Sequence, residues 1–283
     1  MKDFNKKIIF IVGGSSGIGL STAKLLAKKG AHIIIFARDK NRLKIAITEI
    51  KDQRLSDSQL FGFMSLDVSV RKKVETIMKK AVSDFGTPDM LINCAGRSYP
   101  RHFEDITFDQ FDETMKINLY GIWNTISVLL PYMKQKGGHI SNVSSIAGFI
   151  GVFGFTDYSA SKFAIIGFSE ALKSELKKYN ITVSVLCPPD TDTPAFEVEN
   201  RTKPEETKAI SASAKLMQPD DVAAAFVHGV MKGKFIIIPG VDGKFTYVMK
   251  RCFQRRRFTN IKKGNSLHCF LLVIFNILNI LSF

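Results

Sequence analysis

The sequence predicts an α/β fold with a doubly wound, mainly parallel sheet of about seven strands and helices on both faces, followed by a hydrophobic C-terminal tail. Short apolar runs alternate with longer segments of helical period, which is typical of such sheets. A glycine-rich turn joins the first apolar run to the first helical segment. Residues 1–240 carry this pattern and are long enough for one large domain.

The predicted elements follow one another in regular alternation. Strands are expected at residues 7–12, 32–38, 60–68, 89–96, 137–145, 181–189 and 235–239. Helices are expected at residues 20–29, 71–85, 158–178 and 220–231, and residues 108–133 read as two consecutive helices. This order requires crossover connections and therefore parallel pairing.

The turn GGSSGIG follows the first strand and opens the first helix. Glycines at such a turn let the backbone approach a phosphate, and the helix N-terminus offers N–H groups and a favourable dipole. A tight turn that only needs glycine is the alternative, but the flanking strand and helix favour a dinucleotide site. Its candidate residues are Gly13, Ser15, Ser16, Gly17, Ile18 and Gly19.

The end of the second strand predicts which dinucleotide is bound. An acidic residue there would bind the ribose 2′-hydroxyl of NAD, whereas an arginine accommodates the 2′-phosphate of NADP. Ala37 is not acidic, Arg38 follows it, and Arg42 comes one helical turn later. Asp39 is expected to cap the next helix. The sequence therefore predicts NADPH.

Polar residues or glycines lie at the carboxyl ends of five predicted strands. They are Gly13, Arg38, Asp67, Asn93 and Ser145. Ligands of open parallel sheets bind at this edge. The coincidence predicts one site that draws on all five strands.

The segment NVSSIAGFIGVFGFTDYSASK combines serine hydroxyls with a tyrosine and a lysine. On a helix, Tyr158 and Lys162 share one face. A neighbouring ammonium would lower the pKa of the phenol towards neutral pH, making Tyr158 a proton donor to a carbonyl. Ser144 or Ser145 could hold the same oxygen. By itself the pair also fits a surface helix with a solvated lysine.

Composition excludes two other kinds of site. The four cysteines form no CxxC pair and no His cluster accompanies them, so we expect neither a disulfide framework nor a metal. The net charge is +14, and the segment after Gly240 contains eight Lys or Arg residues and one acidic residue. Such a cluster suits nucleic acid or an anionic membrane.

Together these motifs resemble the short-chain dehydrogenase/reductase family, over roughly residues 6–239. The resemblance rests on GGSSGIG, Asp67, NCAG, the asparagine in KINLYG, the serine pair and YSASK. It implies a Rossmann-type fold, Tyr158 as acid/base, and Lys162 as a residue that lowers the Tyr158 pKa and binds the nicotinamide ribose. It also implies that Ser145 positions the carbonyl and that Asn118 supports a proton relay. In the cofactor site, it implies that Asp67 meets the adenine amino group and that Asn93 shapes the loop under the cofactor. Cys94 and Pro189 depart from the family pattern.

Residues 188–207 and 154–176 are similar to the 3-ketodihydrosphingosine reductases. This resemblance implies a membrane-bound enzyme that reduces 3-dehydrosphinganine to sphinganine with NADPH in sphingolipid biosynthesis. Its substrate is a long-chain ketone with a nearby amine, and Asp190 and Asp192 could face that amine. They would equally serve as turn and cap residues. Alternatives are reduction of another lipophilic ketone (3-oxoacyl, steroid or retinoid) and a membrane-attached NADP-binding protein without turnover.

Residues 267–283 contain no Asp, Glu, Lys or Arg and are just long enough to span a bilayer. The basic residues of 241–266 precede them, so we expect a basic linker, a membrane anchor and a catalytic domain facing the cytoplasm. No nucleic-acid partner is expected, because the basic run leads directly into apolar sequence. A buried or dimer-packing tail helix is the alternative. Helices 108–133 and 158–178 leave a homodimer or homotetramer open.

Overall fold

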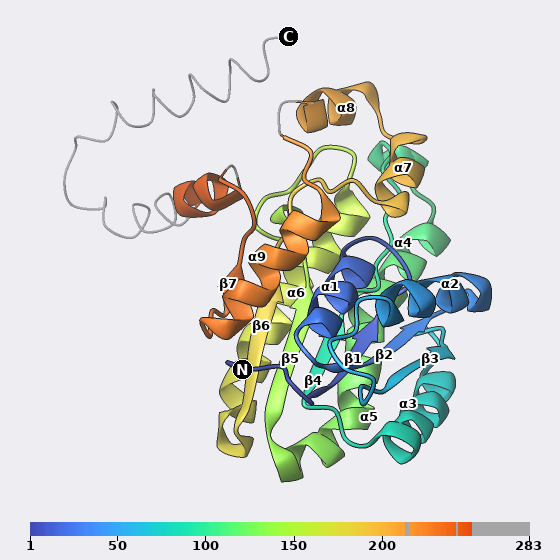
Figure 1. Ribbon diagram of the computed structural model, residues 1–283. Coiled ribbons are helices and arrows are strands. Elements are labelled where there is room, and N and C mark those ends of the chain that lie inside the picture. Colours follow the sequence, from blue (N-terminus) through green and yellow to red (C-terminus); the bar gives the residue numbers. More distant parts are fainter. Residues whose placement is uncertain (213–214, 242, 251–283) are drawn as a thin grey trace, which may run out of the picture.

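The computed structural model describes residues 1–212, 215–241 and 243–250. Their centre is a seven-stranded parallel sheet in the order β3-β2-β1-β4-β5-β6-β7 (Figure 1). The strands are β1 (Ile8–Val12), β2 (His32–Ala37), β3 (Phe61–Ser65), β4 (Met90–Asn93), β5 (Gly138–Val143), β6 (Ile181–Leu186) and β7 (Ile236–Ile237). This confirms the predicted sheet. Each strand is shorter than expected, mostly because residues at the carboxyl ends leave the sheet to form loops.

Side chains of one strand alternate between two apolar cores. Ile9 and Ile11 of β1 pack with helices α1, α2 and α9, whereas Phe10 and Val12 pack with α3, α5 and α6 on the other face. Both sheet faces are covered, so the central strands read as continuous apolar runs. The bounds are α1 (Gly17–Lys28), α2 (Lys40–Lys51), α3 (Arg71–Phe85), α5 (Gly121–Lys136), α6 (Thr156–Leu176) and α9 (Pro219–Met231).

The two helices expected in residues 108–133 are present, but no loop separates them. Helix α4 (Phe108–Met115) continues through a π turn, Lys116–Tyr120, into α5. Thr107 and Gln110 close a capping box at the start of α4. The π turn carries Asn118, and such turns are frequent at functional sites.

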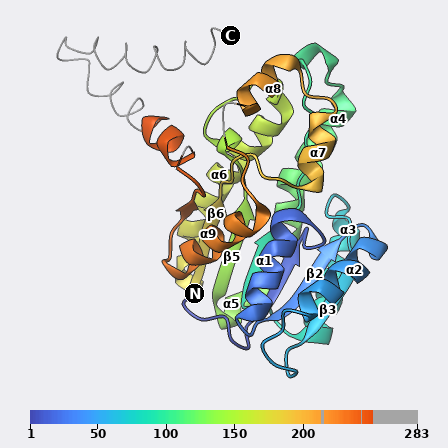
Figure 2. The same cartoon turned by 45° about the horizontal axis from the view of Figure 1, so that its top comes forward.

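Two short helices were not predicted. They are α7 (Pro194–Asn200) and α8 (Glu205–Ala212), and both lie beyond the carboxyl ends of the strands (Figure 2). Thr193 caps α7, with Pro194 in its first turn. At seven and eight residues these helices are too short to show a clear helical period, so the sequence read as a loop.

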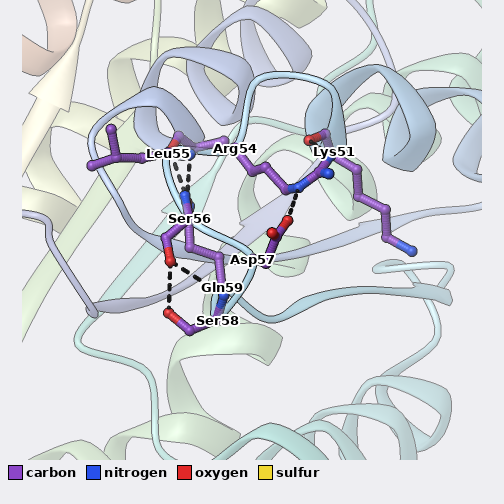
Figure 3. A network of polar contacts seen from close by, with 8 residues as sticks. Lys51, Arg54, Leu55, Ser56, Asp57, Ser58 and Gln59 are labelled. Carbon is purple, nitrogen blue, oxygen red and sulfur yellow. Dashed lines mark hydrogen bonds and ion pairs between the residues drawn. The ribbon is translucent and has the colours of Figure 1, made fainter.

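The loop from α2 to β3 is held by one buried amide, that of Gln59 (Figure 3). Its side-chain oxygen accepts hydrogen bonds from the backbone N–H groups of Leu55 and Ser56, at 2.6 and 2.8 Å. Its nitrogen donates to the carbonyls of Ala27 and Ala31, at 2.9 and 2.8 Å. These bonds fix the loop to the C-terminal end of α1, near the amino ends of the strands and away from the candidate site.

Residues 243–250 are helical and lean against the domain, although the sequence assigned them to a linker. Tyr247 lies on Phe149, with ring centroids 4.7 Å apart. The predicted anchor at 267–283 and most of the predicted linker lie outside the described residues. Within the described part of the chain, no helix combines the length and the apolar character needed to cross a bilayer.

Candidate active site

A cavity of about 1570 Å³ opens at the carboxyl edge of the sheet. The glycine turn after β1 and the loops after β2, β3, β4, β5 and β6 all contribute to its lining. The remaining walls come from α6, α7, α8 and residues 245–250. The predicted convergence of strand ends on one site is therefore present.

Ser145, Tyr158 and Lys162 meet at this cavity. Ser145 follows β5 and caps a single helical turn, accepting a hydrogen bond from the backbone N–H of Ala147 at 3.1 Å. Tyr158 and Lys162 lie one turn apart on α6. The Lys162 ammonium is 5.2 Å from the centroid of the Tyr158 ring. The Lys162 nitrogen also donates to the Val143 carbonyl at 2.9 Å, which ties α6 to the end of β5.

The pKa of Tyr158 differs from the sequence-based expectation. It is raised rather than lowered, first because of burial and second because of the negative charge of Glu199, while a hydrogen bond with Ser145 acts in the opposite direction. Burial also lowers the pKa of Lys162, to about 8. Desolvation is thus the largest cause of both shifts, and it acts against the charged form of each group. At neutral pH Tyr158 keeps its proton, as a proton donor requires.

The two serines have different surroundings. Ser144 is buried, and its hydroxyl donates to the backbone carbonyl of Lys162 at 2.8 Å. Ser145 is partly exposed to the cavity beside Tyr158. Ser144 thus fastens α6 to the sheet, and Ser145 is the hydroxyl available to a carbonyl oxygen.

Asn118 is fully buried behind the cavity wall. Its amide nitrogen donates to Ser161 Oγ at 2.9 Å and to the Arg97 carbonyl at 2.8 Å. Its oxygen accepts from the Arg97 N–H at 2.8 Å. A Cβ on Gly96 would lie 3.5 Å from Lys162 Nζ and 3.6 Å from Asn118 Oδ1, so both side chains border that glycine.

The glycine turn is shaped for close approach of a ligand. Gly13 has φ +81°, and a Cβ there would lie 2.6 Å from the Ala95 nitrogen. A Cβ on Gly19 would lie 2.2 Å from the Gly13 carbonyl oxygen. Ser15, Ser16, Gly17 and Ile18 line the cavity at the N-terminus of α1. This backbone cradle fits the pyrophosphate of a dinucleotide.

Charged residues border the same cavity further along the sheet. Arg38 and Arg42 line it and are exposed. Asp39 caps α2, as expected, by accepting from the N–H groups of Asn41 and Arg42. Asp67 also lines the cavity, with one carboxylate oxygen held by the N–H and hydroxyl of Ser69 at 3.0 and 2.6 Å.

Asn93 and Gly19 support the site from behind instead of lining it. The Asn93 amide donates to Asn142 Oδ1 at 2.9 Å and accepts from Thr125 Oγ1 at 2.8 Å. These buried bonds join β4, β5 and α5 beneath the cavity floor. The expected role of Asn93 in shaping the loop under the cofactor is consistent with this position.

The structure adds residues that sequence reasoning missed. Glu199 of α7 lines the cavity, and its carboxylate accepts from Ser98 Oγ at 2.5 Å. Lys203 is buried beside it, 4.0 Å from Asp190 Oδ2. Asp190 lines the cavity as proposed, but Asp192 is exposed, lies outside the cavity lining and bonds Gln218. The only signal for Glu199 was its place in the segment 188–207.

Comparisons with known proteins agree with this geometry. A family model described as short chain dehydrogenase matches residues 7–204. Over 237 residues the chain is 43% identical to 3-dehydrosphinganine reductase of Danio rerio, covering 83% of this chain and 71% of that protein. Over 258 residues it is 38% identical to 3-ketodihydrosphingosine reductase of Dictyostelium discoideum, covering 86% and 77%.

A similar solved structure is a short chain dehydrogenase/reductase from Burkholderia phymatum in complex with NAD. Its TM-score is 0.76, with 22% sequence identity, and the match covers 94% of this chain and 100% of that one. At this identity the likeness concerns the fold.

Proposed function

The chain belongs to the short-chain dehydrogenase family, and on this basis we propose that it reduces 3-dehydrosphinganine to sphinganine with NADPH. The two reductases named above support the choice of substrate, because their similarity extends over most of this chain. The observation that carries the chemistry is the meeting of Ser145, Tyr158 and Lys162 at a cavity shared with the glycine turn.

The proposed reaction needs a proton donor and a fixed carbonyl. A bound reduced nicotinamide dinucleotide supplies the hydride for the ketone carbon. Ser145 and Tyr158 donate hydrogen bonds to the ketone oxygen and stabilise the negative charge that develops there. Tyr158, protonated at neutral pH, then transfers its proton to that oxygen and completes the alcohol.

Lys162 and Asn118 are proposed to support Tyr158 as the proton donor. The Lys162 ammonium offsets the negative charge left on Tyr158 after proton transfer. Its bond to the Val143 carbonyl fixes its position relative to Ser145. Asn118 holds the Arg97 backbone and Ser161 beside Gly96, and we assign to it the support of a relay that returns a proton to Tyr158.

Two exposed arginines support NADPH as the cofactor. Arg38 and Arg42 border the cavity at the end of β2, where Ala37 offers no carboxylate to a ribose hydroxyl. A 2′-phosphate would be bound there by charge-assisted hydrogen bonds. Asp39 caps α2 through one carboxylate oxygen, and its other oxygen lies 3.8 Å from Arg42 Nε.

An apolar wall supports a long-chain substrate. Phe149, Ile150 and Val152 line the cavity, and so do Phe245 and Met249. An acyl chain along this wall would leave the site towards the C-terminal helical segment.

We also propose that residues 267–283 attach the protein to a membrane, with the catalytic domain on the cytoplasmic side. The preceding basic residues support this orientation.

The test is NADPH oxidation by the detergent-solubilised full-length chain, with 3-dehydrosphinganine and a 3-oxoacyl thioester as alternative substrates. We expect preference for the amino ketone. The variant Tyr158→Phe should lose about 10²-fold or more in turnover while retaining cofactor binding. Preference for the thioester would reject the sphingoid substrate and leave the reductase chemistry standing. Full turnover by the variant would reject the proposed acid.

A further inference from the structure

A carboxylate lines the same cavity as Ser145, Tyr158 and Lys162. Glu199 extends from α7, is largely shielded from solvent, and is held by the Ser98 hydroxyl at 2.5 Å. Among charged side chains, it has the largest effect on the pKa of Tyr158. Glu199 lines the cavity in which Ser145 and Tyr158 would hold the ketone.

The neighbouring cation is already engaged elsewhere. Lys203 lies 4.0 Å from Asp190 Oδ2, 4.0 Å from the centroid of the Phe196 ring and 3.3 Å from Ser211 Oγ. Within the described part of the chain, no Lys or Arg nitrogen comes within 4.0 Å of the Glu199 carboxylate. A shielded carboxylate without a close counter-ion favours binding of a cation.

We infer that Glu199 binds the ammonium group of a 2-amino ketone and thereby determines the preference for amine-bearing ketones. This inference rests on the proposed function and extends it to one residue. In 3-dehydrosphinganine the nitrogen is on the carbon next to the carbonyl, so a ketone held by Ser145 and Tyr158 places the ammonium beside that tyrosine. Of the two carboxylates on the 188–207 segment that line the cavity, Asp190 lies 4.0 Å from Lys203 and Glu199 has no such ion pair within the described residues.

Asp190 has a secondary part in this arrangement, and Asp192 has none. Asp190 is paired with Lys203 and lines the same cavity as Glu199. Asp192 is directed away to Gln218. The earlier expectation of a paired Asp190 and Asp192 site is therefore replaced by Glu199, assisted by Asp190.

The decisive experiment compares two ketones of equal chain length, 3-dehydrosphinganine and its analogue with hydrogen in place of the 2-amino group. Glu199→Gln should lower kcat/KM for the amino ketone by about 10- to 100-fold, the size expected for one lost charged hydrogen bond. It should change kcat/KM for the analogue by less than about threefold. Glu199→Asp should retain part of the preference.

Glu197→Gln is the matched control, because Glu197 is exposed on the same helix and does not line the cavity. It should leave both ketones unaffected. Equal losses for both ketones in Glu199→Gln, or no loss, would overturn the inference while the proposed function stands. Failure of the wild-type enzyme to reduce the amino ketone would overturn both.

A measurement on the wild-type enzyme covers the case in which Glu199→Gln does not fold. Inhibition by sphinganine is compared with inhibition by the corresponding alcohol that lacks the 2-amino group. Sphinganine should inhibit at about tenfold lower concentration, since only it carries the ammonium. Equal inhibition would contradict the role of Glu199.

Discussion

Replacing Gly19 by alanine should damage the cofactor site through the backbone alone. The new Cβ would lie 2.2 Å from the Gly13 carbonyl oxygen, and real Cβ contacts essentially never fall below 3.0 Å. The glycine turn and the start of α1 must then separate by at least 0.8 Å, the difference between these two distances. Overpacking of this kind destabilises proteins by about 1–3 kcal/mol.

The displaced turn is the one whose N–H groups would hold the pyrophosphate. Loss of one such charge-assisted bond weakens binding by about tenfold or more. The assay is NADPH titration by fluorescence, together with urea unfolding of the same sample. We expect a higher Kd for NADPH and a lower free energy of unfolding.

Gly167→Ala is the control, for which we expect the opposite change in the free energy of unfolding. Gly167 lies within α6, and a Cβ there meets nothing within 4 Å. Alanine is favoured over glycine in a helix by about 1 kcal/mol, so this variant should be more stable, with an unchanged Kd. Wild-type values for Gly19→Ala, or equal effects of the two substitutions, would refute the argument.

Three further predictions concern other parts of the chain. The double variant Arg38→Ala/Arg42→Ala should reduce the kcat/KM preference for NADPH over NADH by about tenfold or more, through loss of charged hydrogen bonds; an unchanged ratio would argue against the 2′-phosphate site. His139 is buried among the hydroxyls of Thr182, Ser141 and Ser184, and burial lowers its pKa to about 3. Below pH 6.5 the unfolded state binds a proton at this histidine and the folded state does not. As the pH is lowered from 6.5 to 3, the free energy of unfolding should therefore fall by up to about 1.4 kcal/mol per pH unit. His139→Gln should weaken this dependence in urea unfolding, whereas an identical pH profile would contradict it. Deleting residues 266–283 should release the protein to the soluble fraction, and a full-length chain that is soluble without detergent would count against the anchor.

Local patterns were enough to predict the sheet and to place the site at the carboxyl ends of its strands. Apolar runs, helical periods and the glycine turn are short-range signals, and parallel strands must bring their carboxyl ends to one edge. Tyr158 and Lys162 were recognisable because a single helix fixes their relative position. Gly13, Arg38, Asp67 and Ser145 were likewise identified by their place after a strand.

Other features depended on contacts between distant segments. Helices α7 and α8 are short and take their positions from the cavity wall that they complete, so no period marked them in advance. The roles of Ser144 and Ser145 separated only when α6 packed against β5. The choice of Glu199 over Asp192 required the path of the chain across the cavity.

The sequence by itself determined the α/β class, the alternation of strands and helices along the chain, and the residue types needed for hydride transfer to a ketone. Only the tertiary structure decided the electrostatics of the site. The pKa of Tyr158 is raised because burial and the negative charge of Glu199 outweigh the hydrogen bond with Ser145. Desolvation and long-range charge depend on which segments close over a group, and these segments lie far apart in the chain.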